Sequence, residues 1–275
     1  MIFVYKVWED FCRKLHEKNI HSICAKDVFN CNEKYVVLKH DVETDVNRAF
    51  EMAKIESKYG HRGVYYVQAY LLSNLQHVEI LKKIESLGHE VSYHYDVMDA
   101  CKGNIDEAIK EFGKNLDIFK NAGFSIYTLC QHGNPIVERV GYTSNRDFFR
   151  NAKVQRLYPN LSDIMVDFKV KAKTEYIYFS DAGRQFKLIF DPINNDIVKS
   201  DDKNIGFENL DDLIPYIEKK NCIISTHPHR WTKSANAYVV KMCLFKIVKT
   251  SAKIIIKIPF MKGIMSRYYY LAKKI

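Results

Sequence analysis

The sequence has little glycine and proline and no long apolar segment, and each of these absences excludes a class of protein. Eleven glycines and six prolines in 275 residues are too few for a fibrous or low-complexity chain. No uncharged apolar run approaches the roughly 20 residues that a membrane-spanning helix requires. The apolar start meets Glu9 and Asp10 early, so we expect no export signal. The length fits one α/β domain with an appendage.

The cysteines show no pairing pattern. There are seven of them, an odd number, and no two form a Cys-x-x-Cys pair. A chain of this length also has no need of disulfide bonds to stabilise a small core. The cysteine usage therefore favours a reducing compartment, and we expect a cytoplasmic protein.

Acidic residues are absent from the end of the chain. None follows Glu218, whereas residues 232–275 hold ten lysines or arginines. The net charge of the whole chain is +9, so residues 1–231 are close to neutral, at −1. We expect a domain over residues 1–231 and a basic tail over 232–275. A neutral domain and a tail without a recognised nucleic-acid module argue against a nucleic-acid partner.

Short apolar strands alternate with amphipathic helical stretches along the first half of the chain. This alternation is typical of a parallel sheet or barrel in an α/β protein. Between about residue 134 and residue 205, turn signals predict loops and minor strands. The strands are predicted at 35–38, 64–67, 90–93, 125–130, 175–179 and 222–226, and the clearest helices at 46–60, 80–88, 105–123 and 208–220.

Polar side chains follow these strands at the points where each strand ends. In a barrel the carboxyl ends of the strands meet on one face, where barrel enzymes place their sites. Imidazoles gathered with carboxylates have the composition of a metal site with nitrogen and oxygen ligands. The residues concerned are His40, Asp41 and Glu43 after the first strand, His94 and Asp96 after the third, His132 after the fourth, and His227 and His229 after the last.

Three of these segments carry a resemblance to a known family. The segments VVLKHDVE, GHEVSYHYD and IISTHPHRW resemble the motifs of NodB-homology polysaccharide deacetylases, in particular the divergent branch of O-antigen and capsule gene clusters. The resemblance covers residues 34–231, and the segments HGNP and SDAGR are also similar to that branch. It implies a distorted (β/α) barrel, with seven strands expected.

The resemblance also implies roles for four residues. The first acidic residue after strand one, Asp41, matches the general base of the family. Glu43 and His94 match two metal ligands, and His227 matches the general acid. A divalent ion, with zinc the expected metal, polarises the acetyl carbonyl in this chemistry, and the acid protonates the departing amine.

This chain departs from the family pattern at two positions. The second ligand histidine of the family falls on Met98, and methionine is a poor ligand for such an ion. Either Asp96 or His132 is therefore the third ligand, or the site binds metal weakly or not at all. Glu43 replaces an aspartate and is one methylene longer.

Further side chains on the same rim are expected to contact substrate. For two of them a second interpretation stays open. Trp231 either stacks on a sugar or packs in the core, and Arg184 either contacts substrate or pairs with Asp181. The expected substrate contacts are His40, Asn134, Arg184, His229 and Trp231.

We therefore expect a metal-dependent hydrolase that deacetylates an N-acetyl sugar, nucleotide-linked or lipid-linked, in surface polysaccharide biosynthesis. The alternative is an inactive saccharide-binding barrel or scaffold of a glycan-assembly complex, which Met98 favours. A metal-dependent phosphoesterase would need more bridging carboxylates than this rim offers.

The basic tail predicts an amphipathic helix over residues 239–258. Lys246, Lys249, Lys253 and Lys257 share one helical face, and the apolar side chains lie away from it. This composition is typical of a helix that lies on an anionic membrane surface, so we expect peripheral binding to the inner face of the cell membrane. The alternative is a terminal helix packed against the barrel.

Overall fold

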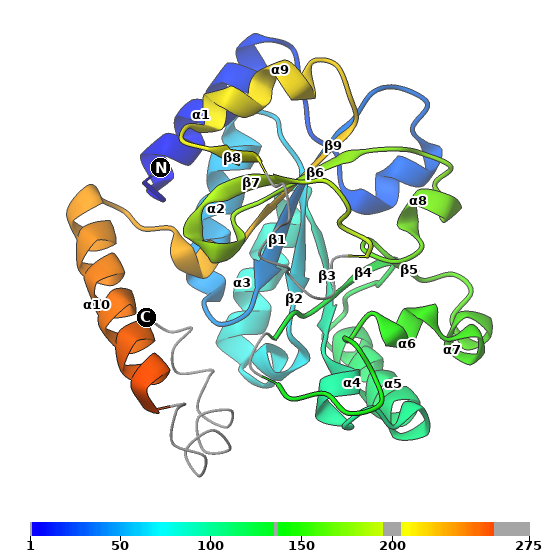
Figure 1. Ribbon diagram of the computed structural model, residues 1–275. Coiled ribbons are helices and arrows are strands. Elements are labelled where there is room, and N and C mark those ends of the chain that lie inside the picture. Colours follow the sequence, from blue (N-terminus) through cyan, green and yellow to red (C-terminus); the bar gives the residue numbers. More distant parts are fainter. Residues whose placement is uncertain (1, 135–136, 195–204, 256–275) are drawn as a thin grey trace.

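The computed structural model describes residues 2–134, 137–194 and 205–255, which form one large sheet with helices around it (Figure 1). Most of its strands are short, buried runs of β-branched and aromatic residues, as expected when both faces of a sheet are covered. The strands are β1 (Val36–Val42), β2 (Gly63–Val67), β3 (Glu90–Tyr95), β4 (Thr128–Gln131), β5 (Ser162–Asp163), β6 (Ile177–Ser180), β7 (Phe186–Ile189), β8 (Ile205–Phe207) and β9 (Cys222–Thr226).

The sheet has nine strands in the order β5-β4-β3-β2-β1-β9-β6-β7-β8. Neighbours from β5 to β6 run parallel, and β7 and β8 continue the sheet antiparallel. The predicted α/β class with a mostly parallel sheet is therefore observed. Within the described residues no pairing joins the edge strands β5 and β8, so the expected seven-stranded closed barrel is not confirmed.

Helices cover the outer face of the sheet, with α1, α2 and α3 side by side and α5 against β3. The α-helices are α1 (Tyr5–Glu17), α2 (Val46–Lys58), α3 (Leu75–Ser86), α4 (Val97–Ala100), α5 (Ile105–Asn121), α6 (Asp147–Arg150), α7 (Ala152–Leu157), α8 (Phe168–Lys171), α9 (Ile214–Ile217) and α10 (Ala235–Ile255). The 3₁₀ helices are η1 (Ala25–Asn30), η2 (Ala69–Ser73), η3 (Ala182–Arg184), η4 (Leu210–Leu213) and η5 (Pro228–Arg230).

Most of the predicted elements are present, with two notable differences. The sequence did not predict α1, whose buried side chains pack with the outer core against α2. The expected single helix over 208–220 is instead divided into η4 and α9, because Pro215 follows directly after the junction and cannot donate a backbone hydrogen bond.

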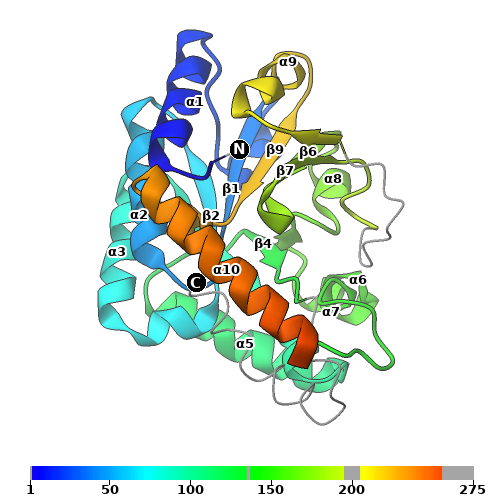
Figure 2. The same cartoon turned by 60° about the vertical axis from the view of Figure 1, so that its left-hand side comes forward.

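The predicted tail helix is present as α10, which begins earlier than expected and crosses the front of the molecule in Figure 2. Its inner side meets the rest of the protein through Tyr238, Lys241 and Phe245. Just before α10, Thr232 pairs with the N-terminal segment, since its backbone N–H donates to Phe3 O at 3.0 Å. Lys257 and the rest of the tail lie outside the described residues.

The outer side of α10 is apolar and faces solvent. Val239, Val240, Leu244 and Ile247 are 55%, 60%, 47% and 62% exposed. These four side chains therefore do not pack against the sheet, whereas the packed-helix alternative requires such packing. No helix among the described residues is both long enough and apolar enough to cross a bilayer.

Candidate active site

Side chains alternate between two faces along β1, and this alternation selects the residues of the site. Val37 lies in the inner core cluster, whereas Leu38 lies in the outer cluster beneath the helices. Because every second side chain along a strand lies on the same face, Lys39, Asp41 and Glu43 lie on the inner side with Val37. These three residues line one pocket, together with His94 of β3 and His227 after β9.

Asp41 is held by a buried lysine on the same strand. The Lys39 ammonium donates to both carboxylate oxygens of Asp41 at 2.6 Å and to the Ser225 hydroxyl at 3.1 Å. Burial would lower the pKa of Lys39, but the Asp41 carboxylate raises it well above its usual value. Burial would likewise raise the pKa of Asp41, yet Lys39, with His94 and His227, lowers it. Both groups are therefore charged at neutral pH.

His227 is oriented by a buried carboxylate from another strand. Its Nδ1 lies 2.5 Å from Asp181 Oδ1, and its backbone N–H donates to Asp181 Oδ2 at 3.0 Å. Arg230 donates to the same Oδ1 at 2.8 Å. Burial would raise the pKa of Asp181, but Arg230 and His227 lower it to about 2. With Nδ1 engaged, His227 turns Nε2 toward Asp41, 3.8 Å from Oδ2.

Glu43, His94 and His132 form a candidate metal group. Their ligand atoms lie within 4.8 Å of one another, and all three residues are buried. His132 Nε2 is 3.3 Å from Glu43 Oε1. Two imidazoles and one carboxylate are a donor set that zinc uses in catalytic sites, with a fourth position left for water or substrate.

Contacts around His94 fit a metal ligand. Its Nδ1 lies 3.0 Å from the Cys130 carbonyl oxygen and, as the protonated nitrogen, donates to it. Nε2 is then the nitrogen without a proton, which is the form that binds a metal. Burial lowers the pKa of His94 to about 3, so the ring is neutral at physiological pH. These observations fit a divalent ion.

A second set of potential donors shares His94. Asp41, His94 and Cys130 also bring their ligand atoms within 4.8 Å of one another. Burial raises the pKa of the Cys130 thiol well above its usual value, so the thiolate needed for metal binding is disfavoured. Asp41 is already engaged by Lys39. The Glu43, His94 and His132 group is therefore the better metal site.

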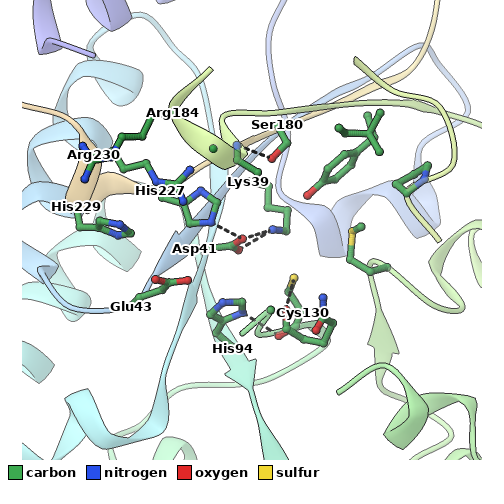
Figure 3. A pocket seen from close by; sticks show the side chains of 18 of the residues that line it. Lys39, Asp41, Glu43, His94, Cys130, Ser180, Arg184, His227, His229 and Arg230 are labelled. Atoms are coloured by element: carbon green, nitrogen blue, oxygen red, sulfur yellow. Dashed lines mark hydrogen bonds and ion pairs between the residues drawn. The ribbon is translucent and has the colours of Figure 1, made fainter. Parts of the chain in front are cut away.

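Figure 3 shows Asp41 near the middle of the pocket, with His94 and Cys130 on one side of it. His227, His229 and Arg230 lie together on another side. The cavity has a volume of about 450 Å³, which is within the range of small-molecule sites.

Two of the expected substrate contacts are core residues instead. His40 is fully buried on the outer face of β1, with Nε2 3.0 Å from Glu56 Oε1. Trp231 is also fully buried, and its ring packs against Phe3 and Trp8. Their predicted contacts with sugar are therefore wrong. The second interpretation of Trp231, a packed core residue, is the observed one.

Other predicted residues are divided between the pocket and its surroundings. Asp96 does not belong to either metal group of the described residues, and Asn134 does not line the pocket. Arg184 and His229 do line it. Asp181 pairs with His227 and Arg230, so the alternative partner proposed for Arg184 is engaged elsewhere.

Two functional residues, Lys39 and Asp181, were not predicted as site residues, and neither was Cys130, which lines the pocket. Lys39 lies inside the first strand, and a strict period of two from Asp41 predicts its position on the same face. Asp181 comes directly after β6, and its place at the end of a predicted strand is the signal that marks it. Cys130 ends a predicted strand, and nothing in the sequence distinguishes it from a core cysteine.

Removal of a metal ligand is expected to abolish metal binding. Glu43→Ala and His94→Ala should each weaken zinc affinity by more than about 100-fold, because even partners outside the ligand shell contribute 10–100-fold. Asp96→Asn is the matched control and should bind like the wild type. Metal content after dialysis and competition with a chromophoric chelator measure the effect. Loss of metal in Asp96→Asn, with retention in Glu43→Ala, would contradict the assignment.

Comparisons with known proteins find similarity at the level of structure only. No family model matches the sequence, and no curated protein matches it. A family 4 carbohydrate esterase from Streptomyces lividans in complex with acetate is 14% identical over 72% of this chain and 80% of its own, with a TM-score of 0.42. A variant of peptidoglycan deacetylase PdaC from Bacillus subtilis is 14% identical over 80% of this chain and 98% of its own, with a TM-score of 0.31. At this level of similarity, the chemistry of the chain rests on its own residues.

Proposed function

We propose that this protein is a metal-dependent hydrolase of the carbohydrate deacetylase type, acting on the acylamide of a sugar. One observation carries the proposal. Asp41 and His227 face each other at 3.8 Å in a pocket that Glu43 and His94 also line, and the buried His132 completes the metal group with these two. A base, an acid and a metal group in one cavity are the parts that amide hydrolysis requires.

Asp41 is the proposed general base. It is ionised because Lys39 lowers its pKa, so it accepts the proton of the water that attacks the amide carbonyl. The two 2.6 Å hydrogen bonds from Lys39 fix the carboxylate plane and keep the base in one position. Fixed positioning of a reacting group lowers the entropic part of the barrier.

His227 is the proposed general acid. Asp181 holds its Nδ1, which leaves Nε2 to donate a proton to the departing amine. An amide nitrogen must be protonated to leave, since an amide anion is a very poor leaving group. Asp181 is therefore a positioning residue for the acid.

The metal group supplies the electrophilic part. A divalent ion held by Glu43, His94 and His132, with zinc as the expected metal, would polarise the acyl carbonyl when bound. The chain keeps this group in order through the backbone. His132 N–H donates to Tyr95 O at 2.7 Å, and its carbonyl accepts from Asn145 Nδ2 at 2.8 Å.

His229 is a proposed substrate contact. Its ring is 7% exposed and lines the pocket, and Nδ1 has no hydrogen-bond partner among the described residues. A buried polar atom without a partner costs about 1–3 kcal/mol. Burial lowers the pKa of His229 well below its usual value, so the ring binds as a neutral group.

A second candidate function is saccharide binding without turnover. Lys39 favours it, because both oxygens of Asp41 are engaged and the basicity of the carboxylate is reduced. Met98 no longer argues for it. That side chain is 4% exposed in the core beneath the helices, and His132 offers the donor that the position lacks.

Release of acetate separates the two functions. We expect the zinc-loaded protein to release acetate from nucleotide-linked or lipid-linked N-acetyl sugars, to stop after chelation, and to recover when zinc is returned. Binding of these sugars without acetate release, at full metal occupancy, would instead establish the binding protein.

The cellular setting is part of the same proposal. The motif resemblance suggests a role in surface polysaccharide biosynthesis, and the tail suggests the inner membrane face. The exposed apolar side of α10 supports the second suggestion, since Val240, Leu244 and Ile247 face solvent near the exposed Lys246. Such a helix lies flat in the interfacial region of an anionic bilayer. The proposed division at residue 232 separates this tail from the domain.

Binding to vesicles tests the membrane proposal. The protein should co-sediment with anionic vesicles at low salt and dissociate as salt rises, because each basic residue near the surface contributes about 1 kcal/mol. Leu244→Asp combined with Ile247→Asp should abolish binding. Gln76→Glu combined with Ser86→Glu, at exposed positions of α3, lowers the net charge by the same amount. This double variant should keep most of its vesicle binding. Equal loss in both double variants would contradict an apolar contact with lipid.

A further inference from the structure

The proposed chemistry leaves one part of the pocket unexplained. Its lining carries more basic than acidic side chains, and Arg184 and Arg230 lie beside His227 and His229 (Figure 3). The carboxylates of the lining are already engaged, because Asp41 pairs with Lys39 and Glu43 belongs to the metal group. The basic side chains of the lining are Lys39, Arg146, Arg184 and Arg230.

Arg184 is held at the pocket by apolar partners. Its guanidinium lies 4.0 Å from the Phe245 ring centre, and Nη1 lies 3.6 Å from the Met242 sulfur, both on α10. Neither partner neutralises the charge. Burial and the nearby Arg230 lower the pKa of Arg184, as expected of a cation that forms no ion pair with the described residues.

The backbone at Arg184 is unusual and supports a specific role. Gly183 and Arg184 have φ angles of 77° and 64°, and the left-handed region is uncommon for residues other than glycine. An arginine in this conformation costs free energy that the surrounding structure must offset. The turn places the side chain against the inner side of α10, where it lines the pocket.

Arg230 is only partly neutralised. It donates through Nη1 to Asp181 O and Oδ1, but Asp181 also holds His227. One carboxylate thus faces two cationic groups when His227 is protonated. The side chain of Arg230 is 16% exposed and reaches the same cavity.

We propose that Arg184 and Arg230 form a binding site for the phosphate or diphosphate of a phosphate-linked sugar, adjacent to the hydrolytic groups. This inference rests on the proposed function and specifies its substrate class. The planar fork of a guanidinium matches phosphate oxygens in pairs, and a partly buried site strengthens the charge interaction. A neutral polysaccharide segment would not need two such cations. The phosphate comes from a lipid or a nucleotide carrier.

Titration with inorganic pyrophosphate tests the site without any catalytic step. The protein is kept in chelator, so that metal does not bind the probe, and calorimetry measures the affinity. Arg184→Asn is the preferred variant, because asparagine tolerates a positive φ better than most residues. It should weaken pyrophosphate binding at least tenfold. Arg62→Gln removes an exposed arginine outside the pocket and should bind like the wild type.

The control also corrects for the basic tail, whose contribution is the same in all three proteins. Equal affinity of Arg184→Asn and the wild type would overturn the proposal, provided that thermal melts show both folded. A nucleoside diphosphate and a short isoprenyl diphosphate then identify the carrier. The probe that binds more tightly than pyrophosphate, and loses this affinity in Arg184→Asn, identifies the carrier. No increase for either probe would leave pyrophosphate as an adventitious ion only and would also overturn the proposal.

Failure of the phosphate site and failure of the hydrolase remain distinguishable. Pyrophosphate binding through Arg184 without acetate release would support the phosphate site and contradict the hydrolase function. Acetate release from neutral N-acetyl sugars that is unaffected by Arg184→Asn would support the hydrolase function and contradict the phosphate site.

Discussion

Asp41→Asn is expected to lower turnover by about 10²-fold or more while the protein stays folded. Asparagine keeps the shape of the side chain but cannot accept the proton of the attacking water, and general base catalysis contributes about 10²–10⁴-fold. His227→Ala should cost a similar factor, since it removes the proton donor for the amine. Steady-state rates of acetate release on one substrate, at full zinc occupancy, measure both effects.

Asp96→Asn is the matched control for these two variants. Its carboxylate belongs to neither metal group of the described residues and does not line the pocket, so the turnover of this variant should match that of the wild type. The turnover of Asp181→Asn should lie between that of the wild type and that of His227→Ala, because the substitution weakens the contact that orients His227 without removing the acid. Wild-type turnover in Asp41→Asn or in His227→Ala would contradict the assigned roles.

Glu56→Ala is expected to cause the largest loss of stability, about 3–5 kcal/mol. Glu56 is fully buried on α2 and accepts hydrogen bonds from Trp8 Nε1 at 2.9 Å and the Tyr65 hydroxyl at 2.8 Å. His40 Nε2 lies 3.0 Å away, and His89 Nδ1 lies 3.7 Å away. Removing the carboxylate leaves the buried Trp8 Nε1 and the Tyr65 hydroxyl without their acceptor. Urea unfolding followed by circular dichroism measures the loss.

Glu51→Ala, on the same helix, provides the control. Its side chain is 38% exposed and pairs with Lys54, so its loss should change stability by no more than about 0.5 kcal/mol. A loss of less than about 1 kcal/mol in Glu56→Ala would contradict the structural role of this network.

The Glu56 network also predicts how stability depends on pH. Burial would raise the pKa of Glu56, but His40, His89 and Tyr65 lower it below the ordinary value of 4.5. A carboxylate with a lowered folded-state pKa stabilises the protein above that ordinary value and loses the effect as pH falls through the folded-state pKa. The stability difference between the wild type and Glu56→Gln should therefore shrink on acidification below about pH 4.5.

The sequence was sufficient to identify six of the nine strands and polar residues at their ends. A strand is a local pattern of a few β-branched and aromatic residues, and its carboxyl end follows directly from its position. Asp41, Glu43, His94 and His227 could be named in this way, and the structure brings all four to one pocket. The antiparallel extension and the unpaired edges of the sheet could not be predicted from the sequence, because strand pairing joins segments that are far apart in the chain.

Which of these polar residues reach the pocket was decided by the tertiary structure. His40 and Asp41 are neighbours in sequence, yet the pleat of β1 sends one to the outer core with Glu56 and the other to Lys39. The same holds for Trp231, which fills the core against residues of the N-terminal segment. Adjacency in sequence does not show which face a side chain takes until the packing on both sides is known.

The third metal donor and the partner of the acid were likewise decided by folding. Asp96 and His132 were equal alternatives by composition, and only the pairing of β3 with β4 brings His132 beside Glu43 and His94. Asp181 meets His227 because β6 and β9 are neighbours in the sheet, although the two residues are 46 positions apart. Local patterns determined which chemical groups this chain has at its strand ends. The order of the strands determined which groups meet, because those contacts depend on hydrogen bonds between distant segments.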